Sequence, residues 1–304
     1  MHQLPDGVAP LPHWGVIRVQ GADAPTFLHN QLTQDFSLLG ASEARLAAFC
    51  TAKGRMLASF IGIKRAPDDV LLVCSRDVLA PALKRLSMFV LRAKAKLSDA
   101  TDQFVLRGLS GEALRAVVPQ DQQPWQRTDA GEAHVVGLYP ADGVLRGLWI
   151  APAGTPEPAG QPLPEDVWRW GEVRSGIAMV GAPVAEAFVP QMLNYESVGG
   201  VNFKKGCYPG QEIVARSQFR GTLKRRAYLV HADAALQAGQ EVFEASDAQQ
   251  PAGTVADAAP APGGGWDAIV SMQVAAAGGQ LAAGSATGPA LAVLPLPYGL
   301  LEDI

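Results

Sequence analysis

The feature of this sequence that most constrains its fold is a change of hydrophobic pattern near Lys224. Before this residue, segments that alternate apolar and polar residues are interleaved with segments of helical period. After it, only short alternating segments remain, at regular spacing. Strands mixed with helices are typical of α+β layers, whereas evenly spaced short strands are typical of a small barrel or sandwich. We therefore expect an α+β region followed by an all-β domain over residues 223–304.

The α+β region divides into two predicted units and a connecting segment. The first unit, residues 1–100, is predicted to contain a strand at 14–21, a helix at 22–35 and two strands within 45–65. A strand at 69–75, a helix at 77–91 and a last strand at 95–99 follow. The second unit, residues 101–164, reads as a strand, a helix and paired strands, and it ends in a Pro/Gly-rich connector. A helix near residue 165 opens the segment 165–222, part of which we expect to complete the first unit.

Composition excludes several classes of protein. Of the 304 residues, 48% are hydrophobic and 18% charged, which supports sizeable cores and argues against global disorder. The net charge of −4 gives no overall attraction to polyanions. We find no apolar run long enough to span a membrane and no signal-peptide pattern, so a cytoplasmic protein is expected. Three separated cysteines and five histidines without ligand spacing predict neither disulfides nor a metal site.

The segment "KKGCYPGQE", residues 204–212, is the strongest local candidate for chemistry. Lys204 and Lys205 supply cations beside Cys207, and cations favour a thiolate. The residues 208–211 fit a type II turn, with a helix beginning near Gln211 or Glu212. The alternative is a small buried cysteine under a turn, and the local sequence alone favours that reading.

Two segments of this acidic chain are basic. Residues 204–226 contain Glu212 as their only acid, and residues 84–96 contain none. Such segments indicate either solvated surfaces or a local anionic partner. Nucleic acid is one such partner, but single-strand binding needs exposed aromatic residues between the cations, and few occur here.

The longer motif "NFKKGCYPGQEIVARSQFRG", residues 202–221, resembles the signature of the YgfZ-type folate-binding proteins, relatives of the glycine-cleavage T-protein (aminomethyltransferase). The pattern Lys-Gly-Cys-Tyr-x-Gly-Gln-Glu matches residues 205–212 throughout. The resemblance extends to residues 14–35, to "AAFCTAKGRM" and to the ending "PLPYGLLED", and it is weakest over residues 101–160.

This resemblance implies two ferredoxin-like α+β units and a C-terminal β-barrel around a central folate channel. It implies a factor that binds tetrahydrofolate or a derivative, which can be polyglutamylated, and supports assembly or repair of iron–sulfur clusters. The implied partners are folate and iron–sulfur client enzymes, including a tRNA-modifying methylthiotransferase, with no membrane and no direct nucleic-acid partner. No stably bound metal is expected.

The family pattern also implies site residues. It places Trp14 and Trp168 at the folate, with Trp168 chosen over Trp170 because it lies eight residues before Gly176. It raises Cys207 to a functional thiol, held by the turn after it. The complete set of expected folate-binding residues is Trp14, Trp168, Lys204, Lys205, Tyr208, Gln211, Glu212 and Arg220.

Three departures from the T-protein bear on the reaction. The T-protein has an acidic pair on its first hairpin, where this chain reads "GRMLAS" at 54–59, and it has an acid in place of Cys207. Arg174 stands where some relatives have a glutamate suited to the pterin ring. The missing hairpin acid argues against aminomethyl transfer. A one-carbon transferase and an RNA-binding accessory module are the two alternative functions.

Overall fold

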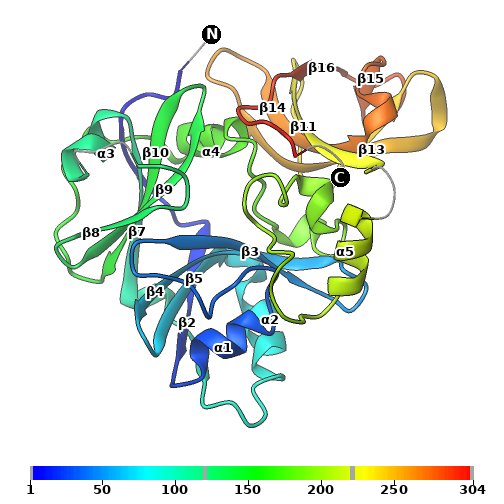
Figure 1. Ribbon diagram of the computed structural model, residues 1–304. Coiled ribbons are helices and arrows are strands. Elements are labelled where there is room, and N and C mark those ends of the chain that lie inside the picture. Colours follow the sequence, from blue (N-terminus) through cyan, green and yellow to red (C-terminus); the bar gives the residue numbers. More distant parts are fainter. Residues whose placement is uncertain (1–2, 119–121, 220–222, 302–304) are drawn as a thin grey trace.

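The computed structural model describes residues 3–118, 122–219 and 223–301. Figure 1 shows two sheets and a barrel arranged around a common centre. This arrangement confirms the predicted fold class of two α+β units followed by a β-barrel. Arg220, one of the expected folate-binding residues, lies outside the described residues.

The first sheet has the strand order β3-β4-β5-β2-β6, with antiparallel neighbours throughout. Its strands are β2 (Trp14–Gln20), β3 (Ala44–Cys50), β4 (Met56–Ala66), β5 (Asp69–Ser75) and β6 (Lys96–Asp99). Side chains alternate between its faces, so Val16 enters the central core while Ile17 packs under the helices α1 (Ala24–His29) and α2 (Arg76–Ser87). Because both faces are covered, the inner strands β4 and β5 are mostly apolar, whereas the edge strand β6 is polar and partly exposed.

The helix α1 is shorter than the helix predicted over residues 22–35. It ends at His29, with Asn30 as its cap, because the following residues bond to the edge of the first sheet instead. The Thr33 amide donates to the Ala48 carbonyl, and the Thr33 hydroxyl accepts from the Ala48 amide. These bonds to a distant strand outweigh the local helical pattern.

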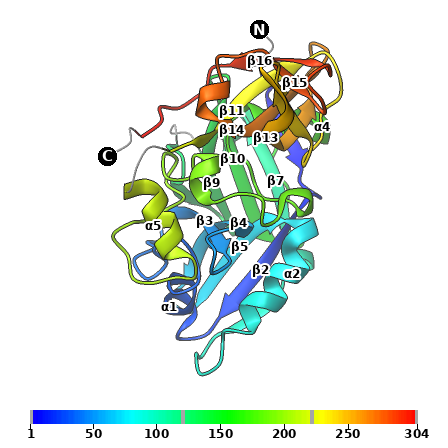
Figure 2. The same cartoon turned by 90° about the vertical axis from the view of Figure 1, so that its right-hand side faces the viewer.

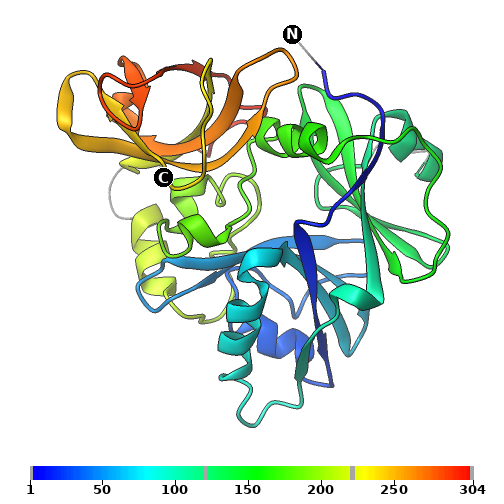
Figure 3. The same cartoon turned by 180° about the vertical axis from the view of Figure 1, so that it is seen from behind.

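The second sheet has the order β1-β7-β10-β9-β8. Its elements are β1 (Gly7–Pro10), η1 (Thr101–Gln103), β7 (Phe104–Ser110), α3 (Glu112–Val117), β8 (Arg127–Ala130), β9 (Ala133–Ala141) and β10 (Val144–Pro152). The strand β1 precedes the first sheet in sequence but pairs with β7, so the N-terminal segment runs along both α+β units. The helix α4 (Glu165–Arg174) then lies between this sheet and the barrel (Figure 3).

The connection from α4 to the barrel includes η2 (Ala182–Val184), η3 (Pro190–Leu193) and α5 (Gln211–Phe219), and α5 lies beside the β3 edge of the first sheet (Figure 2). The barrel closes in the order β11-β14-β13-β12-β15-β16. Its elements are β11 (Arg225–Ala232), β12 (Glu241–Glu244), β13 (Asp247–Pro260), β14 (Trp266–Gln273), η4 (Val274–Ala276), β15 (Leu281–Ala283) and β16 (Ala290–Leu294). Among the described residues, no helix has the length and hydropathy needed to cross a membrane.

Candidate ligand-binding cavity and cysteine loop

A cavity of about 520 Å³ lies where the first sheet, the second sheet, α4 and the barrel meet. Its walls combine apolar and charged side chains from segments far apart in the sequence. The residues that matter for its chemistry are His13, Trp14, Tyr139, Arg146, Glu172 and Asp257. Small-molecule sites commonly have this size and this mixture of apolar surface with a few polar groups.

Trp14, one of the residues predicted to bind folate, lines the cavity. It is the first residue of β2 and pairs with Ser75 at the end of β5, so the sheet fixes its backbone. Only 5% of Trp14 is exposed, and its ring packs edge-on against the ring of His13, with centroids 5.8 Å apart. The aromatic surface is therefore held in place before any ligand arrives.

Glu172 brings a carboxylate from α4 to the cavity wall. His13 Nε2 lies 3.0 Å from Glu172 Oε2, and the Trp168 indole donates to Glu172 Oε1 at 2.9 Å. Burial lowers the pKa of His13, but the ion pair and hydrogen bond with Glu172 outweigh it, and the pKa is raised. Glu172 thus joins the segment before β2 to α4 by an ion pair.

Asp257 brings a second carboxyl group, from the barrel strand β13. A register irregularity between Val255 and Asp257 interrupts the pairing of β13 with β14 at this point. Burial raises the pKa of Asp257 to about 7, and the negative charge of Glu172 contributes in the same direction. Near neutral pH this group can therefore either accept or donate a proton.

Arg146 brings a positive charge from the middle of the second sheet. It is 3% exposed, and its guanidinium carbon lies 4.4 Å from the centroid of the Trp168 ring. Burial lowers its pKa to about 10, so it stays protonated at neutral pH. Arg146 is not among the site residues expected from the sequence, although an arginine inside the apolar strand "GVLRGLWIAP" is an available signal.

Trp168 lies behind the cavity wall and does not line the cavity. It is fully buried, with Arg146 over its ring and Glu172 at its indole nitrogen. A Cβ atom at Gly108 would come within 2.5 Å of this ring, so the glycine makes room for it. Trp168 therefore positions two polar residues of the wall.

Arg174, like Trp168, does not line the cavity. Its Nε donates to Asp142 at 2.9 Å, and its Nη1 lies 3.5 Å from Asp267. Asp267 in turn accepts from the Trp170 indole at 2.7 Å. Arg174 is thus neutralised on another side of α4, and Glu172 is the α4 carboxylate that faces the cavity.

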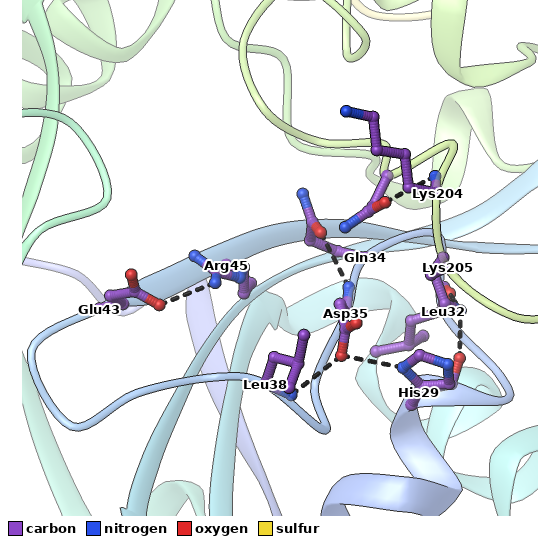
Figure 4. Close-up of polar contacts among 10 residues, drawn as sticks. His29, Leu32, Gln34, Asp35, Leu38, Glu43, Arg45, Lys204 and Lys205 are labelled. Atoms are coloured by element: carbon purple, nitrogen blue, oxygen red, sulfur yellow. Dashed lines mark hydrogen bonds and ion pairs between the residues drawn. The ribbon is translucent and has the colours of Figure 1, made fainter.

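The cysteine loop, residues 204–210, is packed at the end of α1. Lys205 is 9% exposed, and its ammonium donates to the carbonyls of His29 and Leu32, the latter at 2.8 Å (Figure 4). It also lies 4.7 Å from the centroid of the buried Tyr208 ring. Burial lowers the pKa of Lys205 to about 8. A cation at the carbonyl end of α1 suits the helix dipole, so Lys205 anchors the loop.

The rest of the loop presents Cys207 and Lys204 at the surface. As predicted, a turn joins residues 208–211: the Gln211 amide donates to the Tyr208 carbonyl at 3.2 Å, and Gly210 has a φ of +81°. As predicted, a helix begins in this region: α5 starts at Gln211, whose side chain is half-buried. Exposed Glu212 pairs with Arg216 at 2.8 Å, one turn along α5.

The cavity and the cysteine loop involve different residues. No residue from 204 to 212 is among those that line the cavity. The loop packs instead on the turn between β3 and β4, where a Cβ atom at Gly210 would lie 2.4 Å from the Thr51 carbonyl. Cys50 and Cys74 are buried in the core, and burial raises the pKa of Cys50 to about 12. The described residues contain no cluster of three or more His, Cys, Asp or Glu side chains able to hold a metal.

Comparison with known proteins identifies the family. No family model matches the chain. The "tRNA-modifying protein YgfZ" of Edwardsiella ictaluri (strain 93-146) is 32% identical over 245 residues, which cover 76% of this chain and 72% of that protein. The protein of the same name from Cronobacter sakazakii (strain ATCC BAA-894) is 29% identical over 256 residues, which cover 79% of this chain and 76% of that protein.

A solved structure shares the fold. The glycine cleavage system aminomethyltransferase T from Bartonella henselae superposes with a TM-score of 0.66 at 16% identity. The match covers 98% of this chain and 88% of that structure. The chain therefore belongs to the YgfZ family, and it has the fold of the glycine-cleavage aminomethyltransferase.

Proposed function

We propose that the protein binds a reduced folate in the central cavity and supports iron–sulfur enzymes, including tRNA-modifying ones, in the cytoplasm. The observation that carries the proposal is a cavity with an aromatic wall at Trp14, a buried guanidinium at Arg146 and a carboxyl group at Asp257. The relatives' shared name, "tRNA-modifying protein YgfZ", supports the link to tRNA. The aminomethyltransferase fold supports the link to folate.

The cavity residues fit the chemistry of a pterin. A pterin is a flat heterocycle that carries a carbonyl oxygen beside ring and amino N–H groups. Trp14 offers a flat apolar surface, Asp257 an acceptor for N–H groups, and Arg146 a donor for the carbonyl. Bound here, the reduced folate supplies an amine nitrogen that can carry a one-carbon unit.

The cysteine loop has a separate part in this proposal. Cys207 is exposed and serves as the thiol that contacts a cluster, its iron or a cysteine of the client enzyme. Lys204, also exposed, is the proposed contact for the acidic tail of the folate, together with Arg220. Lys205, Tyr208 and the first turn of α5 hold the loop in shape rather than touch the ligand.

A one-carbon transferase is the second candidate function. Asp257 favours it, because a carboxyl group with a pKa of about 7 can move a proton to or from a bound amine. The hairpin residues 54–59, which carry no acid, weigh against it. An assay of formaldehyde transfer to tetrahydrofolate decides between the two, since only the transferase turns over.

A cellular experiment tests the proposed function. In bacteria that lack their own member of this family, this chain should restore methylthiolation of tRNA and the activity of the methylthiotransferase. Mass spectrometry of tRNA nucleosides measures the first, and the empty vector is the control. Unrestored methylthiolation, with this chain soluble and well expressed, would refute the proposal.

A further inference from the structure

Arg146 has buried donors that the protein leaves unused. Its Nη1 donates to the Tyr139 carbonyl over 3.4 Å, a long hydrogen bond. Its Nε and Nη2 are buried, and neither has a hydrogen-bond partner among the described residues. These two nitrogens lie on the same edge of the planar guanidinium, which is the edge that binds two adjacent acceptors at once.

The neighbouring carboxylates do not satisfy this edge. Glu172 is close enough to favour the charged form of Arg146, but its two oxygens bond His13 and Trp168. Asp257 also forms no ion pair with Arg146 among the described residues; its Oδ1 accepts from the Ala258 amide at 2.9 Å. Trp168 supports the guanidinium plane from one side and offers no acceptor to its edge.

A buried charged donor without a partner is costly for a fold and calls for an explanation. The Arg146 side chain lines the cavity, so a ligand there can supply the missing acceptors. The same cavity holds Asp257, an acceptor of N–H groups. A ligand edge that satisfies both residues must carry acceptor and donor atoms side by side.

We propose that Arg146 is a specificity-determining residue, which donates through Nε and Nη2 to the two lone pairs of the carbonyl oxygen of an oxo-heterocycle, while the N–H groups beside that carbonyl face Asp257. The assignment rests on the proposed folate function and deepens it, because the pterin of folate has such an edge. Folate also carries carboxylates, which present two acceptors without a donor. The pairing of Arg146 with Asp257 in one cavity favours the pterin edge over a carboxylate.

Two substitutions and three probes test this assignment. Arg146→Lys keeps the charge and removes the paired donors, whereas Arg146→Met keeps the chain length and removes both. The probes are tetrahydrofolate, 6-methyltetrahydropterin, which has no carboxylate, and p-aminobenzoylglutamate, which has no pterin.

Calorimetric titration measures the affinity of each protein variant for each probe. Both substitutions should weaken 6-methyltetrahydropterin and tetrahydrofolate about 10- to 100-fold, as expected for a lost charged hydrogen bond. Binding of p-aminobenzoylglutamate should not change.

The temperature of thermal unfolding without ligand is a second readout. If Arg146 stabilised the fold, its replacement would lower this temperature. Arg146→Met removes an unpaired buried charge and should unfold at the same temperature as the unchanged protein or higher. The assignment would be overturned if both folded variants kept the pterin affinity of the unchanged protein, or if only the binding of p-aminobenzoylglutamate were weakened. A marked fall in the unfolding temperature of Arg146→Met would also overturn it. Failure of the unchanged protein to bind any probe would instead refute the folate function and this assignment together.

Discussion

His13, just before β2, and Glu172, on α4, form an ion pair with 3.0 Å between Nε2 and Oε2 in the wall of the central cavity. The two residues are 159 positions apart in sequence. The pair connects the first α+β unit to the helix that separates the second unit from the barrel. It also places the negative charge of Glu172 near Asp257, and this charge helps to raise the pKa of Asp257.

The first prediction concerns the charge of His13. Because Glu172 raises its pKa in the folded state, His13 contributes stability that is fully present below the unfolded pKa of about 6.5 and is lost as the pH rises through the folded pKa. Glu172→Gln should bring the pKa of His13 down. An NMR titration of the imidazole measures it, with half-buried Glu165→Gln, a weaker neighbour at 3.4 Å, as the control. An unaltered His13 titration in Glu172→Gln would contradict the ion pair.

A second prediction follows from Asp257. Its folded pKa of about 7 lies above the unfolded value, so the folded state holds the proton more tightly. The carboxyl group therefore contributes stability below about pH 4, and this contribution is lost as the pH rises through 7. Asp257→Asn should be more stable than the unchanged protein at pH 8, and the difference should shrink toward pH 4. Urea unfolding at each pH measures it.

The matched control for Asp257 is on the same strand. Asp247→Asn, at an exposed position of β13, should show no such pH-dependent difference. Equal stability differences for Asp257→Asn at pH 4 and pH 8 would show that the carboxyl group titrates normally.

Lys205 gives a prediction about folding rather than binding. Lys205→Met leaves the carbonyls of His29 and Leu32 without their donor at the end of α1. We expect a loss of about 1–3 kcal/mol in the free energy of unfolding at pH 7. Lys204→Met, at the exposed neighbour, should change it by less than about 0.5 kcal/mol. Similar effects of the two substitutions in urea unfolding would contradict the anchoring role.

The functional prediction for the cysteine loop rests on Cys207→Ser, which nearly preserves size and removes thiolate chemistry. Because the side chain is exposed and does not line the cavity, folding and tetrahydrofolate affinity should be retained. Methylthiolation of tRNA in cells that lack their own family member should fall. Ser217→Ala on the neighbouring helix α5 is the control and should leave methylthiolation unchanged. Cys50→Ser is unsuitable as a control because Cys50 is buried. Full restoration of tRNA methylthiolation by the Cys207→Ser protein would show that the thiol has no functional role.

The elements of the fold could be predicted where local pattern determines them. The strand beginning at Trp14 and the helix beginning at Glu165 follow from periodicity, and the turn at Pro209-Gly210 follows from its residues. The pairing of β1 with β7 and the end of α1 at His29 could not be predicted, because both depend on partners distant in sequence. Local propensity carries no information about such partners.

The candidate site was predicted only in part, for the same reason. Trp14 was found through the family pattern, but Arg146, Glu172 and Asp257 come from a sheet, a helix and a barrel. No spacing in the sequence relates these three residues, and each alone reads as an ordinary charged residue. Trp168 was singled out by the family pattern, yet its place behind the wall depends on Arg146 and Gly108.

The most direct test of the account is the affinity for tetrahydrofolate of the Trp14→Ala protein, measured by anaerobic calorimetric titration. Trp14 lines the cavity, and loss of an aromatic contact beyond area burial is worth on the order of 1 kcal/mol. With the lost apolar contact added, the affinity should fall about tenfold or more. Trp266→Ala, at a half-buried barrel position outside the cavity lining, is the control and should bind normally. Equal affinity of folded Trp14→Ala and the unchanged protein would contradict a folate site in this cavity.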